Sequence, residues 1–180
     1  MRQSHLLMHR PTLTDLPEMP VLPKAFALDD CNESDSEALA ELLGAAFEDP
    51  LWTVERVNNA LLRASDIRRT FAIRNDARIV ATASLRYMPD RFPSAAYVHW
   101  VAVDPMIRGM RLGRIVSLAV LRLGVEQDLH DAWLETDDFR LPAIATYLGL
   151  GFLPALRGED HSERWRIALL NLGRDPAHYL

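Results

Sequence analysis

The sequence predicts a mixed α/β sheet in one domain, and three observations lead to that class. Strand-like and helix-like runs alternate along the 180 residues, which is typical of sheets covered by helices. Hydrophobic residues make up 49% of the chain and charged residues 25%, as in an ordinary globular domain with a sizeable core. The stretch "VHWVAVDPMIRGMRLGRIV" at 98–116 passes from a strand-like run, through a turn with two glycines, into a helix-like run.

The first 24 residues differ from the rest because they hold four prolines and no periodic pattern. Proline fixes its own φ and lacks the backbone N–H that helices and sheets use. We therefore expect residues 1–24 to form an extended arm that lies on or beside a domain formed by residues 25–180. The domain begins with an expected strand at 25–31, where "AFALDDC" alternates between apolar and polar side chains.

Two helices are expected next, at 34–47 and at about 53–64. Ser34 or Asp35 can cap the first helix, and Asp49-Pro50 ends it. Apolar side chains recur every three or four residues in both segments, as on the buried face of a helix. These side chains are Leu39, Leu42, Leu43 and Phe47 in the first helix and Val54, Val57, Leu61 and Leu62 in the second.

The second half of the chain begins with an expected hairpin at 70–88, whose turn lies at Asn75-Asp76 because both residues tolerate turn geometry. Pro142 suits the first turn of a helix. The remaining expected elements are a strand at 96–103, a helix at about 112–127, a strand at 132–136, a helix from 142 to 148 and a last strand at 163–170, "ERWRIALL".

Composition excludes several classes of protein. The net charge of −5 argues against general binding of nucleic acid, which depends on neutralising phosphates. Cys31 is the one cysteine, so an internal disulfide framework and a cysteine-rich zinc site are excluded, and the histidines show no metal-ligand spacing. No run approaches the ~18 apolar residues of a membrane helix, and the first residues lack a secretory signal. We expect a cytoplasmic protein with no metal, no membrane partner and no nucleic-acid partner.

The turn at 108–114 has the composition of an anion-binding site. The first N–H groups of a helix have no partner within the helix, and the helix dipole favours negative charge there. Gly109 and Gly113 allow close approach of a ligand to the backbone, while Arg108, Arg111 and Arg114 add positive charge. An ordinary turn with solvated arginines is the alternative. The glycine patterns of nucleoside triphosphate and dinucleotide sites are both absent.

The segment "AVDPMIRGMRLG" resembles the acetyl-CoA-binding signature of the GNAT superfamily, the Gcn5-related N-acetyltransferases. That signature, [RQ]-x-x-G-x-[GA], follows a strand that ends in an "AV-x-P" turn. Arg108 and Gly113 hold its outer positions, and Arg111 stands where the inner glycine is usual. In the family this turn binds the pyrophosphate of coenzyme A, and the replacement puts one close backbone contact to it in question. A residue other than glycine can still donate its N–H if its dihedral angles allow.

A second segment, "RLPAIATYLGLGF", resembles the family's "N-x-x-A-x-x-L-Y-x-x-x-G-F". Ala143, Tyr147, Gly151 and Phe152 are in register, and Arg140 stands where asparagine is common. The resemblance extends over about residues 25–170. It implies a mostly antiparallel sheet flanked by helices, and an enzyme that transfers an acetyl group from acetyl-CoA directly to an amine. The implied coenzyme-binding residues are Val101, Ala102, Val103, Arg108, Gly109, Met110, Arg111, Leu112, Gly113, Arg114, Arg140, Ala143 and Tyr147.

The resemblance also implies two catalytic residues, each with a structural alternative. Tyr147 falls on the family tyrosine that protonates the leaving thiolate, or it is a helix residue packed on the core. His99 lies on the strand that can carry a general base, or it is a partly buried histidine bonded to a backbone carbonyl; water is the alternative base. Strand alternation predicts His99, Val101 and Val103 on one face of the sheet.

The acceptor is expected to be a small-molecule or peptide amine of unknown identity, and a homodimer is left open. Two other functions remain alongside transfer. One is a non-catalytic module of the same fold that binds acyl-CoA as a sensor or as a structural ligand. The other is an anion-binding domain unrelated to acetyl transfer. Binding of coenzyme A without release of free coenzyme A in the presence of amines would favour the non-catalytic module. Failure to bind any coenzyme A species would favour the unrelated anion-binding domain.

Overall fold

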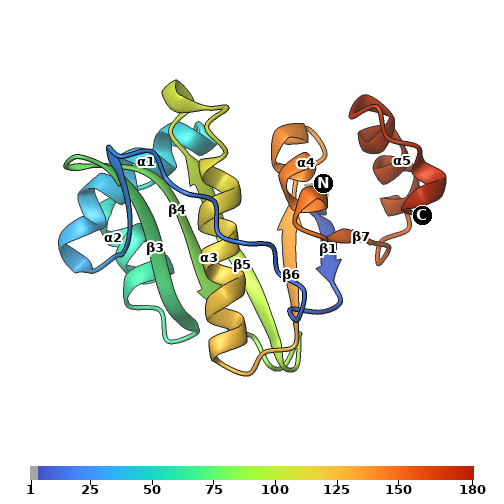
Figure 1. The fold of residues 1–180 in the computed structure, drawn as a ribbon, viewed down its shortest axis with the longest axis horizontal. Helices are drawn as coiled ribbons and strands as arrows, with labels where there is room; N and C mark the ends of the chain where they lie inside the picture. The colour runs from blue at the N-terminus through green and yellow to red at the C-terminus, as the bar shows by residue number, and fades with distance from the viewer. Residues whose placement is uncertain (1–3) are drawn as a thin grey trace.

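A computed structural model describes residues 4–180 as one seven-stranded sheet with helices on both faces (Figure 1). The order across the sheet is β2-β3-β4-β5-β6-β1-β7, and every neighbouring pair is antiparallel except β5 and β6. The predicted class, a mixed and mostly antiparallel sheet in one domain, is confirmed. The strands are β1 (Leu6–Arg10), β2 (Phe26–Asp30), β3 (Ile67–Asn75), β4 (Arg78–Arg86), β5 (Ala95–Val103), β6 (Asp131–Thr136) and β7 (Leu153–Ala155).

Helix α3 (Leu112–Glu126) connects the two parallel strands and covers one face of the sheet together with α4 (Leu141–Gly149). α1 (Ser36–Phe47) and α2 (Val54–Val57), which continues as a π-helical turn (Asn58–Leu62), cover β3–β5 on the other face. Most of the apolar positions that predicted these helices are buried, but Val54, one of those that predicted the second helix, is exposed. In the part of the chain from residue 4 onward, no helix combines the length and apolarity needed to cross a bilayer.

β1 differs from the expectation that residues 1–24 form an extended arm on or beside the domain. This strand lies inside the sheet, where Leu6 pairs with Thr136 of β6 and Leu7 pairs with Ala155 of β7. Leu6 and Met8 are fully buried because both faces of the strand are covered. Its partners lie more than a hundred residues away in the sequence, so no local pattern could identify it.

The proline-bearing segment after β1 does run extended, and it crosses the outer surface of α3 (Figure 1). Arg122 of α3 donates to the carbonyl of Pro17 at 2.9 Å, and the buried Leu13 donates its N–H to His130 at 3.0 Å. The segment therefore lies on the domain and adds apolar side chains to its largest core cluster.

The expected last strand at 163–170 is wrong, because these residues belong to α5 (His161–Asn171). Trp165, Ala168 and Leu169 are buried while Ile167 and Leu170 are exposed, which is a helical spacing that a short alternating run can imitate. The last strand is instead β7, which contains Pro154. Proline is tolerated there because β7 is an edge strand.

Candidate active site

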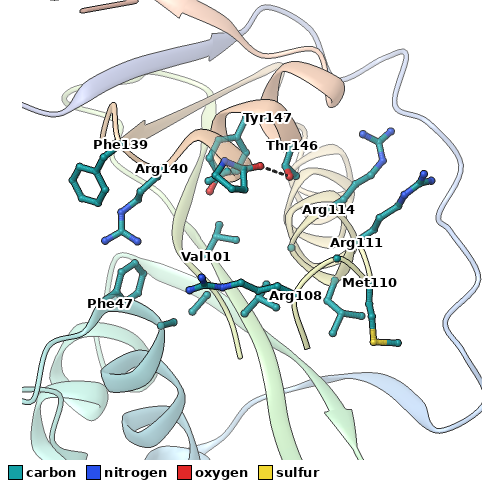
Figure 2. A pocket seen from close by; sticks show the side chains of 18 of the residues that line it. Phe47, Val101, Arg108, Met110, Arg111, Arg114, Phe139, Arg140, Thr146 and Tyr147 are labelled. Atoms are coloured by element: carbon teal, nitrogen blue, oxygen red, sulfur yellow. Dashed lines mark hydrogen bonds between the residues drawn. The ribbon is translucent and has the colours of Figure 1, made fainter. Parts of the chain in front are cut away.

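One cleft of about 960 Å³ opens between the N-terminus of α3, the end of β5, helix α4 and the end of α1 (Figure 2). The thirteen residues assigned above to coenzyme binding all line it. Of the described residues that line this cleft, four are arginines and one, Glu48, is a carboxylate. The cleft is therefore basic in a chain whose net charge is −5.

The turn before α3 has the backbone geometry that the glycine pattern anticipates. Asp104 accepts a hydrogen bond from the N–H of Met106 at 2.8 Å, which fixes the start of the turn. Gly109 has φ 89° and Arg111, at the N-cap of α3, has φ 58° and ψ 18°. This left-handed conformation is the one that glycine adopts most easily. Arg111 therefore adopts a backbone conformation that glycine would adopt without strain, and it adds a positive charge.

Neither Arg108 nor Arg111 forms an ion pair with any residue from 4 to 180. Arg114 donates to the carbonyl of Gly149 at 2.8 Å, which joins α3 to α4 across this end of the cleft. Arg111 and Arg114, neither paired with a carboxylate among residues 4–180, therefore flank the N-terminus of a helix of 15 residues, while the side chain of Arg108 extends from the turn toward Phe47 (Figure 2). Their charges add to the helix dipole, so this end of the cleft favours an anion such as a pyrophosphate.

Strand β5 supplies an open edge to the middle of the cleft. Its parallel pairing with β6 runs from Ala95 to Tyr97 and goes no further, whereas its pairing with β4 continues to Val103. From Val98 onward, the side of β5 that faces β6 lacks ladder partners, and the part at 101–103 lines the cleft. Backbone N–H and C=O groups are strong hydrogen-bonding groups, so this edge can hold an amide-bearing chain or a carbonyl oxygen.

A β-bulge lies in the same strand. Thr82 pairs with Ala102 and Ser84 pairs with His99, so β5 has one residue more than β4 between these pairs. Trp100 has φ 47°, which is rare for a bulky side chain. Its ring packs edge-on against Phe47 at 5.3 Å and Trp52 at 4.7 Å, which hold the bulge in place. Residues held in such conformations cluster at functional sites.

Tyr147 extends from α4 into the middle of the cleft, on the side toward Val101 of β5 (Figure 2). The residue is only 6% exposed, and its ring packs edge-on against Phe152 at 6.0 Å. Burial raises the pKa of the phenol well above its ordinary value, while the charge of Arg140 opposes the shift. Tyr147 is therefore a protonated donor throughout the neutral range.

His99 lies elsewhere. The bulge reverses the alternation, so His99 shares its face of the sheet with Ser84 and Ala102 and not with Val103, and the expected common face is wrong. His99 does not line the cleft, and its ring contacts Tyr97 and Trp100. Burial lowers the pKa of His99 to about 4, and the charge of Arg86 adds to this effect. Its assignment as general base remains a prediction, with an acidic limb expected near pH 4.

The lowered pKa makes a prediction about stability. An unfolded histidine binds a proton near pH 6.5 and His99 only near pH 4, so the unfolded state binds more protons between these values. Wild-type stability should therefore fall, relative to His99→Gln, by about 1.4 kcal/mol per pH unit and roughly 3 kcal/mol in all as the pH drops from 6.5 to 4. Urea unfolding at several pH values measures this difference. Parallel curves for the two proteins would contradict it.

Arg140 lies at the end of the cleft opposite Arg111 and Arg114 (Figure 2). Its guanidinium is 4.7 Å from the ring centroid of Phe47 and 5.2 Å from that of Phe139. This position separates Arg140 from Arg111 and Arg114, with which the sequence grouped it, whereas the side chain of Arg108 extends from the turn toward Phe47 at this end. Phe47, Glu48 and Phe139 also line this end, and the sequence analysis did not assign them to the site. Their order in the chain carries no signal of a shared site, because α1 and the loop before α4 meet only in the fold.

No group of three or more histidine, cysteine or acidic side chains within residues 4–180 is arranged to hold a metal ion.

The chain is similar to known acetyltransferases in sequence and in structure. The model of a family described as the acetyltransferase (GNAT) family matches residues 36–152, which include both segments that carry the resemblance. Glucosamine 6-phosphate N-acetyltransferase of Trypanosoma brucei brucei is 32% identical over 127 residues, which cover 67% of this chain and 84% of that protein.

Two mycothiol acetyltransferases also match, but the chain spans only part of their length. The protein of Segniliparus rotundus is 30% identical over 146 residues, and the match covers 76% of this chain and 55% of that protein. The protein of Nocardia farcinica is 38% identical over 66 residues, which cover 37% of this chain and 22% of that protein.

Solved structures share the fold. A Trypanosoma brucei acetyltransferase superimposes with a TM-score of 0.60 at 26% identity, covering 74% of this chain and 96% of that one. The ribosomal-protein-S18-alanine N-acetyltransferase of Escherichia coli gives a TM-score of 0.62 at 21% identity, covering 73% of this chain and 79% of that one.

Proposed function

Because the chain belongs to the GNAT acetyltransferase family, we propose that it transfers an acetyl group from acetyl-CoA directly to an amine. One observation carries the proposal: a single cleft joins an anion-binding helix N-terminus, an open strand edge and a buried tyrosine hydroxyl. When bound, acetyl-CoA supplies an activated acetyl group on a thioester.

Different residues along the cleft have different roles in the proposed reaction. The backbone at 108–114 and the arginines of this turn bind the pyrophosphate. The open edge of β5 at Val101–Val103 orients the pantetheine arm and can donate to the acetyl oxygen, as in an oxyanion hole. Tyr147 donates to the thiolate that leaves. His99 or water accepts the proton of the amine.

The names of two relatives support an amine as acceptor. One acts, by its name, on the amino sugar glucosamine 6-phosphate, and another on an alanine of ribosomal protein S18. The two acceptors differ greatly in size, so the names support the reaction class and leave the acceptor of this chain open. A small-molecule or peptide amine fits both.

An amine screen tests the proposal. Purified protein is incubated with acetyl-CoA and a panel of amino acids, amino sugars, peptides and polyamines. We expect free thiol to be released only with some amines, and mass spectrometry should find one acetyl group on the amine. Stabilisation by coenzyme A without release of thiol from acetyl-CoA in the presence of any amine would indicate the non-catalytic module. Absence of any stabilisation by coenzyme A would contradict the cleft assignment itself.

A further inference from the structure

Arg140 lies at the end of the cleft opposite Arg111 and Arg114 (Figure 2). Its side chain is held in place, and some of its N–H groups have no acceptor among residues 4–180. Arg140 precedes α4, and its Nε donates to Asp137 Oδ2 at 2.9 Å. Within residues 4–180, this is the one hydrogen bond that the Arg140 side chain makes. The two terminal nitrogens of the guanidinium, with four N–H groups, therefore have no acceptor among residues 4–180.

Two aromatic rings hold the guanidinium. Phe47, at the end of α1, and Phe139, just before Arg140, lie 4.7 and 5.2 Å from its central carbon. Phe139 is 72% exposed, so burial of its own apolar surface does not explain its position. Stacking on aromatic faces removes water from a guanidinium and restricts its orientation, and both effects strengthen the hydrogen bonds that it makes to an anion.

Asp137 completes the support. Burial alone would raise the pKa of this carboxyl, but hydrogen bonds from Arg140 and from His5, the latter at 2.8 Å, lower it below its ordinary value. Asp137 therefore stays ionised and fixes the Nε edge of Arg140. The side chain of Arg140 remains 29% exposed, and it lines the cleft. Its exposed nitrogens are the part available to a ligand.

The position of Arg140 relative to the reacting groups indicates which ligand it meets. Arg140 and Tyr147 both line the cleft, and Tyr147 lies between Arg140 and the side of Arg111 and Arg114 (Figure 2). Arg111 and Arg114 lie at the opposite end, where the helix N-terminus takes the pyrophosphate (Figure 2). An anion at Arg140 is therefore on the far side of Tyr147 from the helix N-terminus, which is the acceptor side in the proposed transfer.

We infer that Arg140, clamped between Phe47 and Phe139, binds an anionic group of the acceptor, so that the substrate is an amine that also carries a carboxylate or a phosphate. This inference rests on the proposed acetyl transfer and specifies its substrate class. A planar guanidinium presents parallel N–H groups to two oxygens of either anion, which a lysine in the same place cannot do.

The test compares pairs of amines that differ only in the anion. One pair is an α-amino acid and its carboxamide, and the other is an amino sugar phosphate and the free amino sugar. Wild-type protein should prefer the anionic member of at least one pair, and the pair that responds distinguishes carboxylate from phosphate. Arg140→Gln should lower kcat/KM for that member about 10- to 100-fold, mainly through KM, because charge-assisted hydrogen bonds are lost. The neutral member should change by less than about threefold.

Further variants keep the result interpretable. Arg140→Lys should fall between wild type and Arg140→Gln, since it keeps the charge and loses the planar fork. Arg166→Gln on α5 removes an arginine paired with Glu163 outside the cleft, and it should leave the anionic preference unchanged. Stabilisation by coenzyme A, measured on each variant, should persist in all three and shows that they are folded.

Two results would overturn the inference while acetyl transfer stands. One is equal activity of wild-type protein toward both members of each pair. The other is an equal loss toward all amines in Arg140→Gln together with lost stabilisation by coenzyme A, which would return Arg140 to the coenzyme site. If none of the amines led to release of thiol from acetyl-CoA, the proposed function itself would be refuted.

Discussion

Tyr147→Phe is expected to lower kcat by about 100- to 10,000-fold, the range of a general-acid contribution, with little change in the affinity for acetyl-CoA. The substitution keeps the ring, which packs against Phe152, and deletes only the hydroxyl that reaches the cleft. Steady-state rates at saturating amine, together with coenzyme A binding by calorimetry, measure the two quantities separately.

The pH profile adds a second readout for the same residue. Because burial raises the pKa of Tyr147, its hydroxyl stays protonated across the range in which most amines lose their proton. Wild-type kcat should therefore show no alkaline decline from this group below about pH 10, its unperturbed value.

Tyr87→Phe is the matched control for Tyr147→Phe. This tyrosine contacts Arg68 at the far end of β4 and does not line the cleft. Its variant should retain the wild-type rate. Wild-type turnover in Tyr147→Phe itself would show that Tyr147 only packs the core.

Gly113→Glu is expected to abolish the thermal stabilisation that coenzyme A gives. At a ligand concentration of about 100 times Kd, binding adds about 2.7 kcal/mol, or roughly 5–10 °C in Tm for a chain of this size. A Cβ at Gly113 would lie 3.3 Å from Val103 Cγ2, so a longer side chain is forced away from β5. Its carboxylate would then stand among the arginines that face the pyrophosphate.

The charge alone should not unfold this variant, because a carboxylate in the first turn of α3 interacts favourably with the helix dipole. Val125→Glu places the same group at the exposed far end of the same helix and should keep the full stabilisation by coenzyme A. An unchanged shift in Gly113→Glu would remove the turn from the binding site. Differential scanning fluorimetry with and without coenzyme A is sufficient for both variants.

Local patterns predicted the parts of the fold that local interactions determine. The β3–β4 hairpin was predicted with a turn near Asn75-Asp76 and forms with its turn one residue later, at Asp76-Ala77. α1 and α3 follow from apolar side chains at helical spacing. β1 could not be found in this way, because its pairing depends on strands more than a hundred residues away. The strand predicted at 163–170 is instead part of α5, because the few apolar residues of this segment fit both the two-residue repeat of a strand and the repeat of a helix.

The end of the cleft formed by the turn before α3 could be predicted because its residues follow one another in the sequence at 108–114. The opposite end could not, since Phe47, Phe139 and Arg140 meet only after α1 packs on the sheet. His99 shows a third limit. Strand alternation fixes the face of a side chain only if the strand is regular, and the bulge at Trp100 adds one residue.

The place of β1 within the sheet has a consequence for how the chain folds during synthesis. Leu6 cannot pair until its partner Thr136, 130 positions later, has been synthesised. At ~5–20 residues per second on the ribosome, synthesis of this stretch takes about 6–26 s. Strands β2 to β5 pair antiparallel with their neighbours in the sequence and can form during that interval. Such long-range closure slows folding, and it leaves an apolar segment open to aggregation or chaperone binding until β6 and β7 emerge. β1 can enter the sheet only after β6 has been made, and β7, the edge strand that pairs with β1, can join only after that.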